Sequence, residues 1–177
     1  GKLDIDEGMN IFSCDLSYPG VKRVPGMILW GASLSGPQAV PGQYKVRLVV
    51  NDRSFEKGFS LLADPRSSTA IEDIREQFDF IIDVRDKLTE AHEAIIDIRT
   101  LRKDILDIKG RLDKDRHSDI LELSTATVKN LTEIEEALYQ TKNRSRQDPL
   151  NFPIRLGNKL AALNGVVATG SYKPTDQ

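Results

Sequence analysis

Hydrophobic and polar side chains alternate most regularly over residues 43–50. One face carries only apolar residues: Tyr44, Val46, Leu48 and Val50. A period of two predicts a strand with one buried face. Asn51 and Asp52 follow, and both tolerate the left-handed backbone of a two-residue turn. The pattern resumes at Phe55, Phe59 and Leu61, so we expect a β-hairpin.

Two weaker patterns predict further strands. Phe12, Cys14 and Leu16 alternate within residues 10–16, and residues 27–30 form a short apolar run. We expect Cys14 to be a small buried side chain on the first of these strands. Four strands are too few for a complete immunoglobulin-like sandwich, so a sandwich fragment is expected. Its open edge would invite association with another chain or a second copy.

A different period begins at Ile71. Apolar residues recur there at steps mostly of three and four as far as Leu112, which predicts one very long amphipathic helix. Its length of about 40 residues corresponds to roughly 60 Å. Thr69 and Glu72 fit a capping box at its start. Residues 113–117 break the pattern, so we expect the helix to end there.

Shorter helices are predicted to follow. One starts at Ser118, a second near Ile154 after the polar stretch 143–153, and residues 174–176 read as the cut-off start of a fourth. Together they predict an extended antiparallel bundle. Because the long helix exceeds its partners, its far end should keep uncovered apolar surface.

Glycine and proline divide the chain into two parts. Residues 1–66 hold eight of the 12 Gly and five of the 8 Pro, whereas residues 67–147 contain only Gly110. Long helices exclude both residue types. We therefore expect an α+β chain, with an immunoglobulin-like β domain in 1–66, truncated at its N-terminus, and a helical bundle in 67–177.

Charge, hydropathy and cysteine content each argue against one class of protein. With 25 Lys and Arg against 27 Asp and Glu, the net charge is -2, which argues against a nucleic-acid partner. No apolar run approaches about 18 residues, so no membrane span is predicted. The single Cys14 cannot form an intrachain disulfide.

Catalytic and metal-binding patterns are incomplete. Ser33 lacks a nucleophile elbow, because Ser35 stands where the second glycine belongs. The acidic run from Asp113 begins like a calcium loop, yet Ser118 and Ser124 replace its glycine and its bidentate glutamate. We therefore predict no catalytic residue, no metal and no cofactor in this chain.

The stretch 139–156 is rich in amide and guanidinium donors. It can be a docking loop for a neighbouring domain or a saccharide, or an ordered connection that caps helix ends. Under the first alternative the interaction residues would be Trp30, Tyr139, Asn143, Arg144, Asp148, Asn151 and Phe152. Both alternatives stay open at this point.

Two blocks, residues 25–30 and 147–156, carry a family resemblance. Smaller matching pieces are 8–10, 15–16, 18–20, 36–37, 39–42, 64–66, 138–141 and 158–160. Together they resemble the C-terminal region of large bacterial proteins that carry sortilin-like, BNR-repeat β-propellers and are often labelled glycosyl hydrolases. Cys14 departs from the pattern, which has a Trp there.

The resemblance implies an exported protein, periplasmic or extracellular. It implies that the first strands of the sandwich lie upstream of Lys2 and the last helix beyond Gln177. Any glycosidase activity would belong to the propeller. We expect a non-catalytic accessory module that contacts the N-terminal propeller of the same parent chain, or a second copy through the β edge or the helical stripe. The alternatives are a saccharide-binding part of a glycoside hydrolase and a free-standing coiled-coil adaptor.

Overall fold

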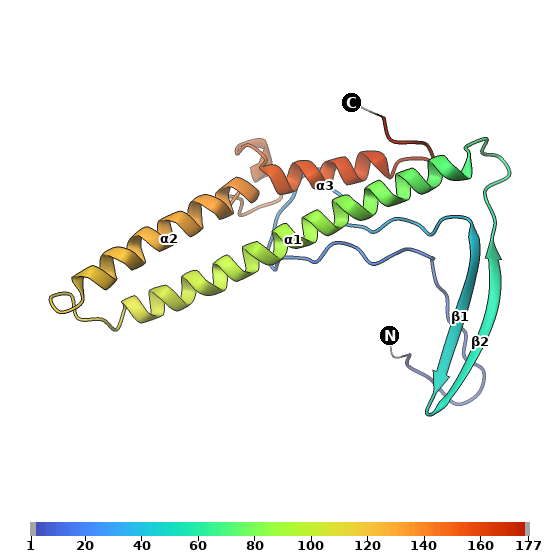
Figure 1. Ribbon diagram of the computed structural model, residues 1–177, viewed down its shortest axis with the longest axis horizontal. Helices are drawn as coiled ribbons and strands as arrows, with labels where there is room; N and C mark the ends of the chain where they lie inside the picture. Colours follow the sequence, from blue (N-terminus) through green and yellow to red (C-terminus); the bar gives the residue numbers. More distant parts are fainter. Residues whose placement is uncertain (1–2, 176–177) are drawn as a thin grey trace.

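A computed structural model describes residues 3–175 of the chain. They form an α+β fold with one two-stranded antiparallel sheet and three α-helices (Figure 1). The elements are β1 (Gly42–Val50), β2 (Arg53–Leu61), α1 (Ile71–Lys109), α2 (Ser118–Leu138), a 3-10 turn (Asp148–Leu150) and α3 (Leu156–Val167).

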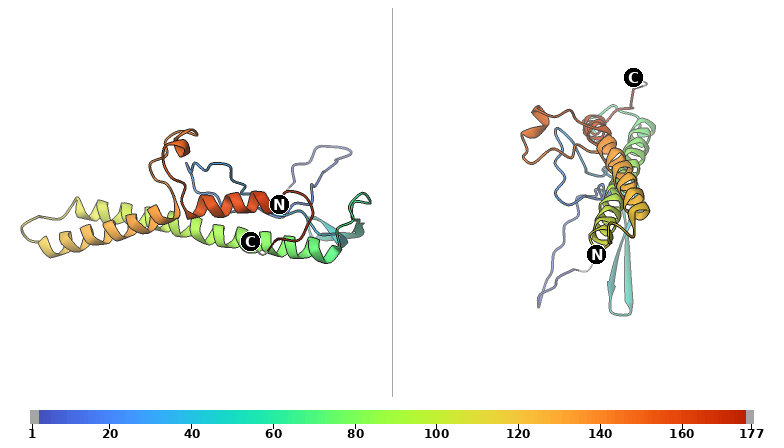
Figure 2. Two further views of the ribbon diagram at one scale, coloured as in Figure 1. Left: turned by 90° about the horizontal axis from the view of Figure 1, so that it is seen from above. Right: turned by 90° about the vertical axis from the view of Figure 1, so that its left-hand side faces the viewer.

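The helices are arranged around α1, which has 39 residues. Both α2 and α3 run back along it one after the other, with α3 on its first half and α2 on its second (Figures 1 and 2). A turn through residues 113–117 joins α1 to α2, as the sequence predicted.

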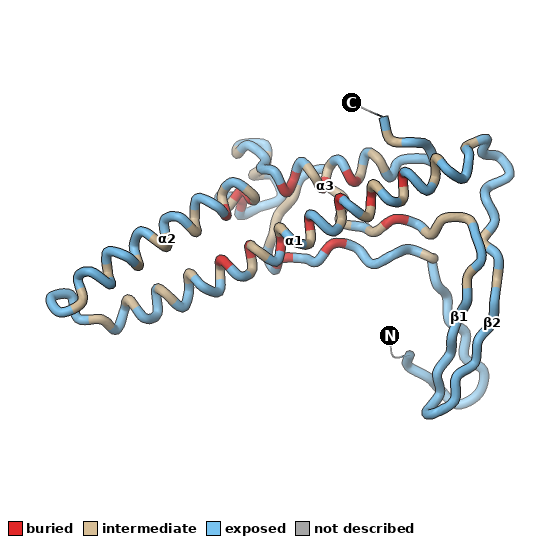
Figure 3. Tube along the Cα trace, viewed as in Figure 1, coloured by how far each residue is buried: buried red, intermediate tan, exposed pale blue. Residues whose placement is uncertain are grey.

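Burial is concentrated on the first two thirds of α1 (Figure 3). A stripe at helical spacing faces its partners: Ile81, Val84, Leu88, Ile95 and Ile98. Beyond this stripe Leu101, Leu106 and Ile108 are exposed. The uncovered apolar surface expected at the far end of the helix is therefore present.

An irregular segment, residues 21–35, lies against all three helices and is called the strap below. Val21 packs with Leu88 of α1 and Ala161 of α3, and Val24 packs with Ile95 and Tyr139. At Gly20 and Gly36 the segments flanking the strap lie so close that an added Cβ would collide with the backbone of Leu34 and Tyr18. The strap thus completes the helical core without regular secondary structure.

Two of the predicted strands, residues 10–16 and residues 27–30, are absent from the described residues. Neither residues 10–16 nor residues 27–30 form a strand, and outside the hairpin the described residues pair only at the bridge between Ser17 and Gln38. The backbone of Ile28 and Trp30 instead bonds to the side chains of Tyr139, Asn143 and Asn158, which take the place of a neighbouring strand. Cys14 is exposed rather than buried, because the segment around it has no strand to pack against.

The predicted hairpin is confirmed, including its turn. Asn51 adopts a φ of 51°, and β1 pairs with β2 from Gly42 opposite Leu61 to Val50 opposite Arg53. Figure 1 shows the hairpin extending away from the N-terminal end of α1.

The ends of the helices differ from the predictions in detail. Ala70 occupies the N-cap of α1 with no side-chain cap, since the Thr69 hydroxyl donates to Ser171 O and accepts from Ser67. The third helix begins at Leu156 rather than near Ile154. Pro174 and Thr175 are not helical, and Asp176 lies outside the described residues.

Candidate functional site

Tyr139 is a structural residue in this fold. Its side chain is buried, its hydroxyl accepts the Ile28 N–H at 3.0 Å, and the Arg99 guanidinium carbon lies 5.6 Å from its ring centroid. Asn143 is also buried, and its side-chain amide donates to Ile28 O at 3.5 Å. Both residues hold the strap, so neither presents a surface to a ligand.

Asp148 closes the loop between α2 and α3. Its carboxylate accepts the backbone N–H groups of Arg144 at 2.5 Å and Ser145 at 2.8 Å, and the Ser145 hydroxyl at 2.9 Å. These hydrogen bonds, from Arg144 first and then Ser145, lower the pKa of the Asp148 carboxyl. Asp148 therefore orders the loop from within.

The remaining predicted residues of this loop have separate local contacts. The Arg144 guanidinium donates to Thr141 O, and the Asn151 side chain is exposed. Phe152 is half-buried, with the Lys142 ammonium 5.9 Å from its ring centroid. The structure does not bring them together with Trp30 into one surface.

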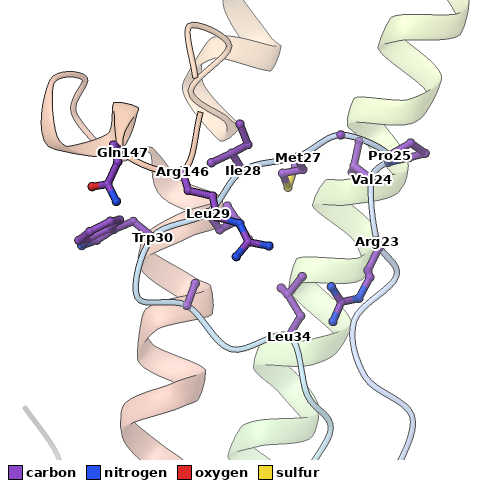
Figure 4. Close-up of a pocket in the computed structure, with 12 residues that line it drawn as sticks. Arg23, Val24, Pro25, Met27, Ile28, Leu29, Trp30, Leu34, Arg146 and Gln147 are labelled. Carbon is purple, nitrogen blue, oxygen red and sulfur yellow. The ribbon is translucent and has the colours of Figure 1, made fainter. Parts of the chain in front are cut away.

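Trp30 lies on a pocket that sequence reasoning did not foresee. The pocket is an open depression of about 730 Å³, lined by residues 23–30, Ala32 and Leu34 of the strap and by Arg146 and Gln147 of the loop (Figure 4). Apolar side chains line its inner part: Met27, Leu29, Ala32 and Leu34. Volumes of about 300–1,000 Å³ are usual for small-molecule sites.

Helix α3 fixes the position of Trp30. Asn158, buried in the first turn of α3, accepts the Trp30 N–H at 2.7 Å and donates to Trp30 O at 2.8 Å. One side-chain amide thus satisfies both backbone groups, as a paired strand residue would. Trp30 remains 43% exposed and is one of the residues that line the pocket.

The pocket carries two unneutralised positive charges. Neither the Arg23 nor the Arg146 guanidinium has an ion pair or a hydrogen bond within residues 3–175, and no acidic residue lines the pocket. Figure 4 shows both guanidinium groups pointing toward its middle. Since arginine stays charged at any physiological pH, the pocket has a positive potential.

A second charged group is fully neutralised and serves packing. Glu135 of α2 is 1% exposed and binds Arg99 at 2.7 Å and Arg102 at 2.5 Å, both on α1. His92 is equally buried, with Nδ1 2.5 Å from Lys22 O. These groups fasten α2 and the strap to α1, and none of them reaches a pocket.

Sequence reasoning found Trp30 and missed Arg23, Arg146 and Asn158. Arg23 and Trp30 are seven residues apart, and the loop carrying Arg146 is distant in sequence. The one local signal was Asn158, an amide at the start of a mainly apolar helix, which is a common sign of a buried hydrogen-bonding role.

Comparisons with known proteins give no family. No family model, no curated protein and no solved structure matches this chain. Within residues 3–175 no helix is long and apolar enough to cross a membrane. No group of three or more His, Cys, Asp or Glu in that range is placed to hold a metal ion.

Proposed function

We propose that this chain is a non-catalytic interaction module of an exported bacterial protein with a BNR-repeat β-propeller. One observation carries the proposal: toward the tip of the β1–β2 hairpin, the apolar side chains of Val46, Leu48, Val50 and Phe55 are exposed. The propeller as partner rests on the resemblance described above.

The two faces of the hairpin differ in chemistry. Directly opposed residues share a face, so Tyr44 with Phe59 and Leu48 with Phe55 fall on the same side as Val46 and Val50. Lys57 and Arg53, the partners of Val46 and Val50, lie on this mainly apolar side as well. On the other side Arg47 binds Glu56 at 2.6 Å, and Gln43 binds Ser60. Such a pattern is typical of a sheet with one face in a core.

The apolar face is nevertheless open to solvent. Val46 is 55% and Phe55 56% exposed, and Leu48 and Val50 are similar. A lone two-stranded hairpin is marginally stable in water, and contiguous exposed apolar surface marks interaction sites. We infer that the face packs against strands of the parent protein and that together they form the expected immunoglobulin-like sandwich.

The far part of the helices offers a second contact surface. Leu101 of α1 and Leu123 and Ile134 of α2 are exposed beyond the region that the strap and α3 cover. In this proposal α1, α2 and α3 form the extended bundle that holds the hairpin at a fixed distance from this surface.

The test combines the chain with the propeller region encoded by the same gene, both purified, in a calorimetric titration. Leu48→Thr with Phe55→Thr should abolish binding, because each removes apolar area from the interface. Arg47→Thr, on the polar face of the same strand, is the matched control and should bind normally.

Three results would overturn the proposal: a gene without a propeller, no binding by the unmodified chain, or equal loss of binding in the control. Sedimentation at equilibrium adds a fourth. If the hairpin face joins two copies of this chain in preference to the propeller, the partner is wrong.

Saccharide binding is a second candidate function, favoured by the indole of Trp30 on its pocket. Tyr139 and Phe152 do not contribute to it, since neither lines the pocket.

A further inference from the structure

We propose that the pocket between the strap and the loop after α2 binds an acidic saccharide, with its carboxylate held by Arg23 and Arg146 and a sugar ring on Trp30. This inference rests on the second candidate function and is independent of the hairpin proposal. Figure 1 places the hairpin at the N-terminal end of α1, whereas the pocket lies near the middle of that helix.

The pocket has an excess of positive charge. Two guanidinium groups approach one pocket from different segments, Arg23 from the strap and Arg146 from the loop, with no counter-charge among the residues that line it. Elsewhere in the protein the arginines around buried groups are paired, as Arg99 and Arg102 are with Glu135. Guanidinium binds carboxylate through two parallel hydrogen bonds, so an anionic ligand fits this pair.

The Trp30 indole offers the pocket a flat aromatic ring. Asn158 of α3 bonds to both the N–H and the C=O of Trp30, so a helix side chain anchors the strap backbone that carries the ring. A half-exposed indole offers a flat apolar face with a polar edge. The C–H face of a pyranose is flat and weakly apolar, whereas its hydroxyls need polar partners such as the Gln147 amide at the same pocket.

The volume of the pocket and the rigidity of a sugar ring both favour a small cyclic ligand. The volume of about 730 Å³ suits a ligand of one or a few rings. A preformed ring loses less conformational freedom on binding than a peptide segment with the same carboxylate. An acidic sugar therefore satisfies the charge, the flat surface and the volume together.

The experiment titrates the full chain with trigalacturonate and with its fully methyl-esterified, neutral form. Trp30 is the single tryptophan, so its fluorescence reports on this pocket alone. We expect the acid to shift the emission and to bind at least about tenfold more tightly than the ester, with affinity falling as salt is raised.

Variants assign the binding to these residues. Arg146→Gln and Arg23→Gln should each weaken trigalacturonate binding about tenfold, measured by calorimetry. Arg144→Gln is the matched control, because its guanidinium lies two residues away on the same loop, binds Thr141 O and does not line the pocket. Trp30→Leu should reduce binding of the acid and the ester alike.

The outcomes separate the two claims. Equal affinity for acid and ester would overturn the acidic ligand while saccharide binding stands. No binding of either would overturn both. Binding of tetraglutamate as tightly as trigalacturonate would make the ligand an acidic peptide and would also overturn the inference. Equal loss in Arg144→Gln would exclude the two named arginines as its basis.

Discussion

The strap and the hairpin satisfy their backbone in opposite ways. The strap has no regular secondary structure, yet Val21 and Val24 are buried within it. The hairpin is fully regular, yet most of its side chains are exposed. Regular backbone hydrogen bonding and side-chain burial are therefore separate properties. The hairpin has the first without much of the second, and the strap has buried side chains without regular hydrogen bonding.

The strap can pack on the helices because helix residues bond to its polar backbone. Asn158 binds Trp30, Asn164 donates to Ser33 O and Ser35 O, and Ala161 O accepts the Ser33 N–H. Each buried peptide group left without such a partner would lower the free energy of unfolding by about 1–3 kcal/mol. The hairpin pairs its own backbone and needs no helix, so it can extend into solvent.

The largest effect is expected where the strap, α1 and α3 meet. Leu88→Ala removes a fully buried side chain that packs with Val21 and Ala161, and should lower the free energy of unfolding by about 3 kcal/mol. Leu106→Ala, exposed on the same helix, is the control and should change it by less than about 0.5 kcal/mol. Urea denaturation followed by circular dichroism measures both. Similar losses would mean that the core is misplaced.

A smaller loss is expected from the amide that replaces a strand. Asn158→Ala leaves the Trp30 N–H and C=O without their partner and should cost about 2 kcal/mol. Tryptophan emission should also shift to the red, since the indole would no longer be held at the pocket. Asn130→Ala, an exposed amide on α2, should do neither. An unchanged emission in Asn158→Ala would contradict the proposed positioning.

This contrast also explains which parts of the fold could be predicted. Local periodicity placed the hairpin and the helices, because spacings of two and of 3.6 are written into neighbouring residues. The strand prediction for residues 27–30 was wrong. Their backbone bonds to the side chains of Tyr139 and Asn158, which are distant in the sequence, and not to a second strand. The prediction that Cys14 is buried was wrong for a different reason, because residues 10–16 form no strand and Cys14 is exposed.

The candidate site was predictable only in part. Trp30 is conspicuous as a single indole near glycines, but its companions Arg23 and Arg146 are ordinary charged residues until folding places them on one pocket. The sequence left two interpretations of the loop open, and its pattern alone could not show that the Tyr139 and Asn143 side chains bond to Ile28.

The hairpin should tolerate changes that the strap does not. Phe55→Thr, near the tip, should change the free energy of unfolding by less than about 0.5 kcal/mol, because the ring is already exposed. Phe59→Thr should cost more, since that ring is half-buried and stacks on Tyr44 with centroids 5.8 Å apart. Urea denaturation of the chain without a partner measures this gradient. A large loss at Phe55 would show that the face is covered in the isolated chain.

The smallest effect concerns the loop that carries Arg146 and Gln147 to the strap. Backbone hydrogen bonds from Arg144 and Ser145 hold the pKa of Asp148 below its usual value, so the charged carboxylate stabilises the folded loop. That contribution is complete above the pKa of the unfolded chain and disappears as the pH falls through the lowered pKa of the folded state. The protection factors of the amides in residues 144–151, which are corrected for the intrinsic pH dependence of exchange, should therefore fall in acid before those in α1 do. Asp148→Asn should show fast exchange already at neutral pH, and an unchanged loop in that variant would mean that Asp148 does not order it.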